Sequence, residues 1–231
     1  MAERRFFSAS EPVDGRLEIA GDEFHHIARV MRYRPGDELE VVNGRGRLWR
    51  GRIAVVATRS LRLEVEATEE FPAPAPRVIV AVSLTKGQAM NWLVEKLCEM
   101  GVDEVRPLAC ERTDVGWSPA QIGRWQKMAA QALKVNRRYW LTRFAPPQTP
   151  AGLVEAAATL PARFLLDVAA PRPLAAPVAR PALLAVGPPG DFSEAEKKRL
   201  RDAGFQPARL NDAVLKTETA ALAGAAILKN D

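Results

Sequence analysis

The chain has 231 residues and a formal net charge of +5, and 47% of its residues are hydrophobic and 26% charged. These proportions are typical of a globular protein and argue against a disordered or fibrous chain. No apolar run reaches the length of a membrane span, and residues 1–5 carry charge where a signal peptide would be apolar. With Cys98 and Cys110 as its only cysteines, the sequence predicts no disulfide framework and no metal site. Together with the absence of an apolar run, this predicts a cytoplasmic protein that does not contact a membrane.

The basic residues are concentrated toward the C-terminal side. Residues 1–76 hold 12 Lys and Arg against 13 Asp and Glu, a net charge of −1, whereas residues 77–231 hold 21 against 15, a net charge of +6. Residues 115–154 contain no acidic residue, and their basic residues are interleaved with Trp125, Tyr139 and Trp140. Two interpretations stay open: a surface that follows phosphates and stacks bases, or a solvated helix face whose aromatic rings lie in the core.

A segment rich in proline and alanine at residues 71–76 predicts an extended linker, because proline fixes φ and lacks the backbone donor. We therefore expect a first domain over residues 1–71, a linker over 72–77 and a second domain over 78–231. In the first domain, period-two alternation predicts strands around 38–41 and 61–65, separated by turns at 34–37 and 43–46. A helix over 22–32 would place Phe24, Ile27 and Val30 or Met31 on one face. The pattern indicates a small β-barrel.

The second domain has the alternating strands and helices of an α/β protein. Apolar runs predict strands at 78–82, 102–108, 163–167 and 182–186, and helical spacing predicts helices at 88–100, 118–138, 193–204 and 217–228. Two of these helices have capping boxes, Ser118 with Gln121 and Ser193 with Glu196. The proline-rich stretches at 145–150 and 171–181 are expected to be loops.

Two loops of this domain are candidates for a ligand site. Residues 187–191 and 210–220 each connect a predicted strand to a predicted helix, and ligands of α/β proteins bind at such places. No dinucleotide fingerprint, phosphate loop or hydrolase nucleophile elbow is present. Taken by itself, the first loop is better explained as a plain tight connection, and helix capping explains Thr217 and Thr219.

The two loops also carry a family resemblance. Gly187-Pro188-x-Gly190-x-Phe192-Ser193-x-x-Glu196, followed by Val214-Leu215-Lys216-Thr217-Glu218-Thr219-Ala220, resembles the motifs of the bacterial 16S rRNA uridine-N3 methyltransferases, which belong to the SPOUT superfamily. The likeness continues along the chain in order, at residues 4–7, 25–37, 96–102 and 124–128. Where the family usually has Gly-Pro-Glu-Gly-Gly-Phe, this chain has Pro189 and Asp191. It also departs from the family pattern at Leu210–Ala213 and at Lys134–Asn136.

The resemblance implies a fold, a reaction and a cofactor. The fold would be a PUA-like β-barrel followed by a SPOUT α/β domain with a deep trefoil knot. The reaction would be methylation of uridine N3 in 16S rRNA or the small ribosomal subunit by a homodimer that uses S-adenosyl-L-methionine. The residues expected to hold this cofactor are Leu165, Leu166, Asp167, Gly187, Pro188, Pro189, Gly190, Asp191, Leu210, Asn211, Val214, Leu215, Thr217 and Thr219.

The resemblance also implies roles for charged side chains. Glu218 would orient the base or accept its proton, although a carboxylate favoured by the helix dipole is an equally good interpretation. Arg138 would stabilise negative charge or anchor a phosphate, either within one chain or across the dimer. The residues expected to bind RNA are Arg4, Arg5, His26, Arg29, Arg32, Arg124 and Lys134. Two alternatives stay open: a non-catalytic RNA-binding paralogue and a methyltransferase with another RNA target.

Overall fold

A computed structural model describes residues 5–74 and 78–230 of the chain. The described residues divide into two compact units. The first contains those up to Pro74 together with Ala130–Leu141, and the second contains the rest. No helix among the described residues is long and apolar enough to cross a membrane.

The first unit is built on a five-stranded sheet with the order β1-β3-β4-β5-β2. Its strands are β1 (Arg5–Phe7), β2 (Arg16–Ala20), β3 (Glu38–Val42), β4 (Arg47–Val56) and β5 (Ser60–Glu70). Strand β1 runs parallel to β3, and the other neighbours are antiparallel. All five strands contribute to one buried cluster, so the sheet curves around a single core, as expected for a barrel-like domain.

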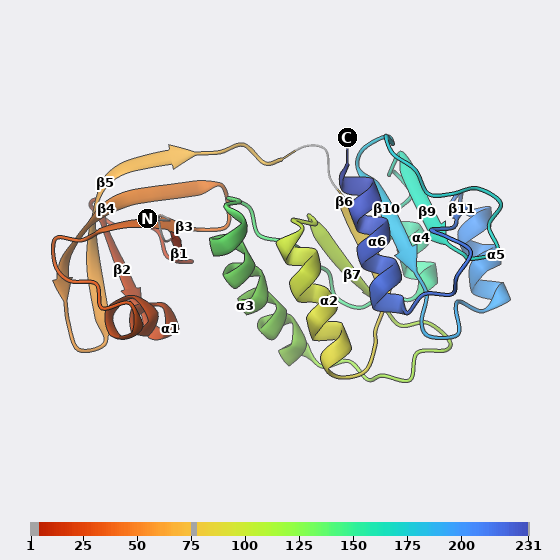
Figure 1. Ribbon diagram of the computed structural model, residues 1–231, viewed down its shortest axis with the longest axis horizontal. Coiled ribbons are helices and arrows are strands. Elements are labelled where there is room, and N and C mark those ends of the chain that lie inside the picture. Colours follow the sequence, from red (N-terminus) through yellow and green to blue (C-terminus); the bar gives the residue numbers. More distant parts are fainter. Residues whose placement is uncertain (1–4, 75–77, 231) are drawn as a thin grey trace. The chain divides into compact units, whose positions relative to one another are not determined.

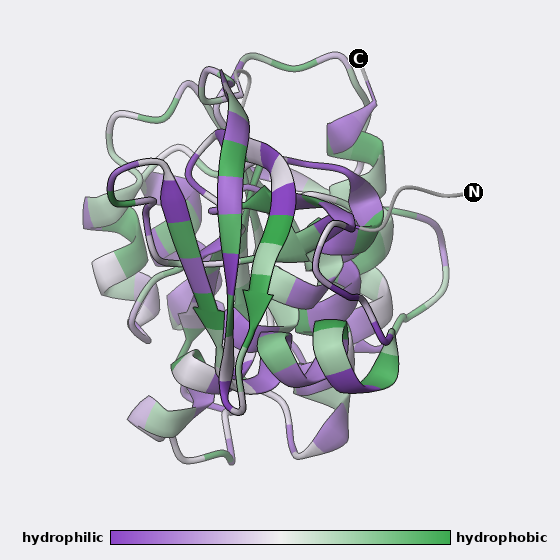
Figure 2. Ribbon diagram, turned by 90° about the vertical axis from the view of Figure 1, so that its left-hand side faces the viewer, coloured by the Kyte–Doolittle hydropathy of each residue, from purple (hydrophilic) through white to green (hydrophobic). Residues whose placement is uncertain are grey.

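Alternation along these strands separates the core from the solvent. In β2, for example, Leu17 and Ile19 are buried and their neighbours are exposed. The same alternation appears as hydrophilic and hydrophobic bands along the strands of the first unit in Figure 2. Strand β1 was not predicted, because three residues carry too little periodicity. Strand β2 was not predicted either, although its buried and exposed residues alternate.

The predicted helix over 22–32 is present in a modified form. A short helix α1 (Gly21–Phe24) continues as a π-helix, η1 (His25–Val30), in which the Met31 amide donates to the His26 carbonyl oxygen. A π-helix has more residues per turn than an α-helix, so the apolar spacing expected for an α-helix no longer applies. Phe24 and Ile27 are buried as predicted; of the two residues proposed for the third position, Val30 is 61% exposed and Met31 is half-buried.

Helix α3 (Pro119–Asn136) contributes to both units, its residues up to Ala129 to the second and the remainder to the first. Within the first unit, Leu133 packs against Val42 and Leu48, and the ring of Tyr139 stacks on Phe71 at 3.5 Å between centroids. The structure therefore places residues 130–141 in the first unit, whereas the sequence-based division assigned them to the second domain. Helical periodicity identifies an apolar face but does not indicate which core that face joins.

The second unit contains a six-stranded parallel sheet with the order β11-β9-β10-β6-β7-β8. Its strands are β6 (Val78–Ser83), β7 (Glu104–Leu108), β8 (Arg143–Phe144), β9 (Ala162–Leu166), β10 (Ala182–Val186) and β11 (Gln206–Ala208). Every residue of β6 and β10 is buried, the pattern of strands covered on both faces.

Helices cover the two faces of this sheet (Figure 1). Helices α2 (Gln88–Glu99) and α6 (Thr217–Lys229) pack together, and α6 contacts β6 and β10. Helices α4 (Pro150–Ala156) and α5 (Glu194–Asp202) also pack together, and the cluster on their side contains Leu153, Leu200 and Phe205. Helix α4 begins in a stretch predicted to be a loop. Pro150 occupies the first turn of this helix, where proline is tolerated, and Thr149 caps it.

Candidate functional site

A cavity of about 690 Å³ lies in the second unit beyond the carboxyl ends of β6, β9, β10 and β11. It is lined by segments at residues 85–89, 166–168, 186–191 and 208–220. Strands β9, β10 and β6 are parallel neighbours, so the loops that follow them meet at one edge of the sheet. Both loops that carry the family motifs therefore contribute to the same cavity.

The loop at residues 187–191 is tightly constrained. A Cβ atom on Gly187 would lie 2.9 Å from the backbone nitrogen of Phe192, so a side chain there would force the loop to move. Gly190 and Asp191 both have positive φ, +85° and +68°. The Thr217 hydroxyl donates to the Gly187 carbonyl oxygen at 3.0 Å. Thr217 is the first residue of α6, and its hydroxyl joins the helix to this loop, while Lys216 occupies the N-cap position without a side-chain cap hydrogen bond.

Two carboxylates of the cavity wall share one buried lysine. The Nζ of Lys197, which is 8% exposed, lies 2.6 Å from Asp191 Oδ2 and 3.3 Å from Asp167 Oδ2. Burial by itself lowers the pKa of Lys197, but the hydrogen bond and charge of Asp191, together with Asp167, raise it above its ordinary value. Lys197 is therefore a protonated cation at neutral pH.

The loop at residues 208–216 forms another side of the cavity. The Asn211 Oδ1 atom accepts a hydrogen bond from the Ala213 backbone nitrogen at 3.0 Å, which folds the loop locally. Asn211 has no positive φ, so of Asp191 and Asn211 only Asp191 occupies a conformation that favours glycine. Glu218 lies in the first turn of α6 and lines the cavity.

The fourth side of the cavity was missed by sequence reasoning. It comes from the segment after β6, with Thr85, Lys86 and Ala89. The Thr85 hydroxyl is buried and has no hydrogen-bond partner within the described chain. The rule that the loops after parallel strands bind ligands applies to β6 as well as to β10, so this segment could have been included.

The predicted cofactor residues occupy the cavity wall with two exceptions. Leu165 belongs to the core cluster beside α4 and α5, and Thr219 is exposed. Neither lines the cavity, whereas all the other predicted cofactor residues do. Leu165 precedes Leu166 in a strand, so its side chain points to the opposite face of the sheet.

The predicted RNA-binding residues fall into three groups. Arg4 lies outside the described residues. His26, Arg29, Arg32 and Arg124 are exposed. The side chains of Arg5 and Lys134 are 8% and 9% exposed, and they form ion pairs with Glu40 and Glu23 within the first unit.

The aromatic residues of the basic stretch are packed. Trp125 is fully buried, and its indole nitrogen donates to Asn91 Oδ1 at 3.2 Å. The indole nitrogen of Trp140 donates to the Phe71 carbonyl oxygen at 3.1 Å. For Trp125, Tyr139 and Trp140 the structure therefore favours core packing over base stacking. Arg138, the predicted anion-stabilising residue, follows α3 in the first unit and is partly buried, and its carbonyl oxygen accepts from Arg5.

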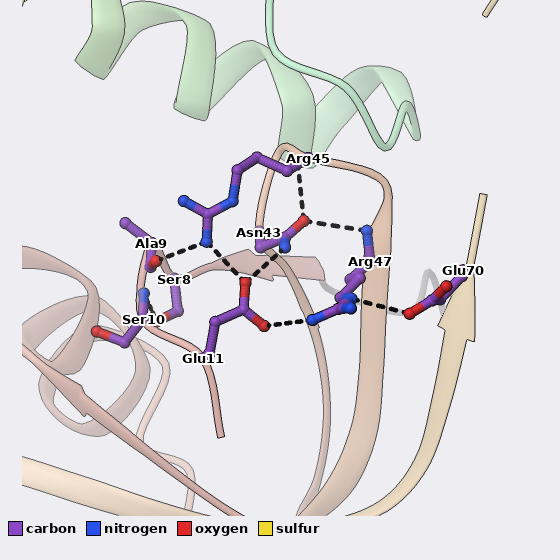
Figure 3. A network of polar contacts seen from close by, with 8 residues as sticks. All are labelled: Ser8, Ala9, Ser10, Glu11, Asn43, Arg45, Arg47 and Glu70. Carbon is purple, nitrogen blue, oxygen red and sulfur yellow. Dashed lines mark hydrogen bonds and ion pairs between the residues drawn. The ribbon is translucent and has the colours of Figure 1, made fainter. Parts of the chain in front are cut away.

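A polar network organises the turn between β3 and β4 (Figure 3). The Asn43 Oδ1 atom accepts hydrogen bonds from the backbone nitrogens of Arg45 and Arg47, at 2.8 and 3.0 Å. Both arginine side chains also pair with Glu11. The hydrogen bond from Arg45, aided by Asn43 and Arg47, holds the pKa of Glu11 below its ordinary value. These arginines therefore stabilise the turn.

The fold and the cavity together define an RNA methyltransferase. Residues 72–229 match the family model of the RNA methyltransferase domain, and residues 19–66 match that of the RNA methyltransferase PUA domain. The chain belongs to this family, and its curated relatives carry the name ribosomal RNA small subunit methyltransferase E. That of Mycobacterium bovis is 30% identical over 228 residues, which cover 94% of this chain and 87% of the relative. That of Synechocystis sp. is 28% identical over 230 residues, which cover 95% and 75%.

A solved structure shares the fold. Ribosomal RNA small subunit methyltransferase E from Neisseria gonorrhoeae, crystallised with S-adenosyl methionine, matches this chain with a TM-score of 0.84. The match covers 96% of this chain and 95% of that chain at 23% identity. This likeness supports the two-part architecture, in which a curved sheet precedes a parallel α/β sheet.

Proposed function

We propose that the chain transfers a methyl group from S-adenosyl-L-methionine to N3 of a uridine in the 16S rRNA of the small ribosomal subunit. The observation that carries this proposal is the single cavity formed by both family-motif loops at the carboxyl edge of the parallel sheet. The names of the curated relatives support the RNA target, and the family resemblance supports N3 of uridine.

The cavity fits the proposed cofactor in size and in chemistry. Its volume of about 690 Å³ is within the range of small-molecule sites. Leu166, Val186 and Leu215 provide apolar surface for an adenine ring. The hydroxyl of Thr85, which has no hydrogen-bond partner among the described residues, provides a buried polar group that a ligand would satisfy. The backbone of residues 187–191 lies at the cavity wall, where amide and carbonyl groups can contact a nucleoside closely.

Glu218 is the carboxylate best placed to act on the target base. Asp167 and Asp191 both form ion pairs with Lys197, whereas Glu218 forms no ion pair within the described chain. When bound, S-adenosylmethionine supplies an electrophilic methyl group on its sulfonium. Uridine N3 is normally protonated, so the nitrogen that forms the new N–CH3 bond must lose its proton. We assign to Glu218 the orientation of the base and the acceptance of this proton.

Arg138 belongs to the first unit, and we propose that the protein is a homodimer in which this residue completes the site of a partner chain. A guanidinium near the uracil would stabilise the negative charge that develops when N3 loses its proton. Because the substrate is a ribosomal subunit, the reaction would take place in the cytoplasm.

The exposed basic residues of the first unit are proposed to bind the rRNA. His26, Arg29 and Arg32 lie in and directly after the π-helix η1 and are exposed. Contacts with phosphates would lose strength as salt rises, because counterions are released on binding. Arg124, an exposed residue of α3, would add to this set.

A calorimetric titration with S-adenosylmethionine, with S-adenosylhomocysteine in parallel, tests the proposed function. Saturable binding at one site per chain or per dimer is expected. Absence of binding, both alone and with small ribosomal subunits present, would leave a non-catalytic RNA-binding protein and overturn the methyltransferase proposal.

A further inference from the structure

Lys197 lies behind the cavity wall. It comes from the buried side of α5, and it does not line the cavity itself. Its two close ion-pair partners do, and they come from different loops: Asp167 follows β9 and Asp191 follows β10. One cation therefore joins the ends of two adjacent parallel strands. Lys198, the next residue of α5, is exposed, and among the described residues its ion pair is with Asp202 of the same helix.

Asp191 combines this contact with an unusual backbone conformation. Its φ of +68° lies in the left-handed region, which is unfavourable for a residue with a side chain. One carboxylate oxygen accepts a hydrogen bond from the Phe192 backbone nitrogen at 2.7 Å, and the other lies 2.6 Å from Lys197. Both oxygens are thus used to hold the loop in a backbone conformation that glycine would reach without help.

Asp167 is held in the same way. Its Oδ1 atom accepts from the Ala169 backbone nitrogen at 2.9 Å, and its Oδ2 atom lies 3.3 Å from Lys197. The Asp167 side chain is 10% exposed, so without a cation its charge would be buried and poorly compensated.

We propose that Lys197 is a positioning residue, which fixes the β9 and β10 loops in their cofactor-binding arrangement through Asp167 and Asp191. The inference rests on the proposed function, since it concerns the cavity assigned there to S-adenosylmethionine. A glycine at position 191 would reach a positive φ without strain. In this chain the ion pair between Lys197 and Asp191 holds residue 191 in that conformation instead. The cavity is therefore organised before the cofactor enters.

Calorimetric titration of variants with S-adenosylmethionine tests this role. Lys197→Met is expected to weaken binding about tenfold, because it leaves two carboxylates without their cation and releases both loops. Lys197→Arg, which keeps the charge and can reach two carboxylates, is expected to bind within about threefold of the wild type. Lys198→Met is the matched control on the same helix and is expected to bind like the wild type.

Asp191→Asn provides a second variant, should Lys197→Met fail to fold. It keeps the acceptor for the Phe192 amide but loses the ion pair, and weaker binding of the cofactor is expected. In both variants, hydrogen exchange without cofactor is expected to be faster at residues 166–169 and 187–192 than in the wild type.

The outcomes separate this inference from the proposed function. If the wild type binds the cofactor and both folded Lys197→Met and Asp191→Asn bind it equally well, the positioning role is wrong and the methyltransferase assignment stands. If Lys197→Arg is as weak as Lys197→Met, the ion pairs are not the cause and the inference also fails. If the wild type itself does not bind, the proposed function fails.

Discussion

The carboxylates of the cavity differ in what surrounds them, and this difference suggests separate roles. Asp167 and Asp191 are held by Lys197 and by backbone amides. Glu218 lies at the start of α6 beside the cavity and forms no ion pair within the described residues. Groups that shape a site are usually held on several sides, whereas a proton acceptor must remain accessible to its substrate.

Replacement of Glu218 by Gln tests its proposed role. The variant keeps the size and polarity of the side chain but cannot accept the N3 proton. We expect the rate of methyl transfer to fall about a hundredfold or more, with little change in cofactor affinity. The rate is measured under single-turnover conditions and the affinity by calorimetry. Full methyl transfer by Glu218→Gln would dismiss the carboxylate as the base.

At the residue scale the sequence predicted most of the cavity wall, because motif residues cluster in two loops. It could not distinguish Leu165 from Leu166, since successive strand residues face opposite sides and the strand's first residue was uncertain. It also did not reveal Lys197, which belongs to no recognised motif and lies behind the cavity wall. The contact between Lys197 and Asp191 depends on the tertiary structure, and a single sequence does not show such pairs.

Helices that begin with a capping motif were the easiest elements to predict. Ser193 and Glu196 form the predicted capping box at the start of α5, with both hydrogen bonds present. At α3, the Gln121 side chain accepts from the Ser118 backbone nitrogen, as half of the predicted box. The π-helix η1 and the membership of residues 130–141 in the first unit could not be predicted, because both depend on tertiary packing.

The turn between β3 and β4 provides a test at the element scale. Replacing Asn43 by Ala removes the acceptor of two backbone amides, and Asn43 itself is 3% exposed. We expect the free energy of unfolding to fall by about 1–3 kcal/mol, the cost of unsatisfied buried polar groups. The measurement is urea denaturation. Asn211→Ala is the control, because Asn211 is exposed and accepts one backbone hydrogen bond. An equal loss of unfolding free energy in both variants would contradict the role of Asn43 in stabilising the turn.

The end of α3 provides a second test. Lys134 and Glu23 form a pair at 2.9 Å, with side chains 9% and 14% exposed. Lys134→Ala leaves a buried carboxylate unpaired and is expected to destabilise the first unit by about 3 kcal/mol. In the double variant Glu23→Gln with Lys134→Met, much of this loss should be recovered, since Gln still accepts from the Phe7 amide. Thermal unfolding measures the stability of the single and the double variant. A double variant as unstable as Lys134→Ala would contradict the claim that the unpaired carboxylate causes the loss.

At the scale of the whole molecule, the motifs indicated the family. The boundary expected at the proline-rich segment stays a prediction. The packing of α3 into both units was not foreseeable from a linear division of the chain. The trefoil knot that the family resemblance implies stays a prediction. It concerns how the chain passes through itself, and no local pattern in the sequence records this.

The proposed dimer makes a prediction about complementation. Arg138→Ala and Glu218→Gln are each expected to be inactive alone. If Arg138 completes the site of a partner chain, mixed dimers contain one intact site, and a statistical mixture should recover about a quarter of wild-type activity. The measurement is methyl transfer after unfolding and refolding the two variants together. A mixture as inactive as its components would place both residues in the same chain's site or leave the protein monomeric.

The most direct test of the central claim is to identify the modified nucleoside. Small ribosomal subunits that lack the modification are incubated with the protein and S-adenosylmethionine carrying a labelled methyl group, and the 16S rRNA is digested and analysed by mass spectrometry. We predict label in N3-methyluridine at a single position, absent with the Glu218→Gln variant. Label in another nucleoside or another RNA, or no label with a protein that binds the cofactor, would contradict the assignment.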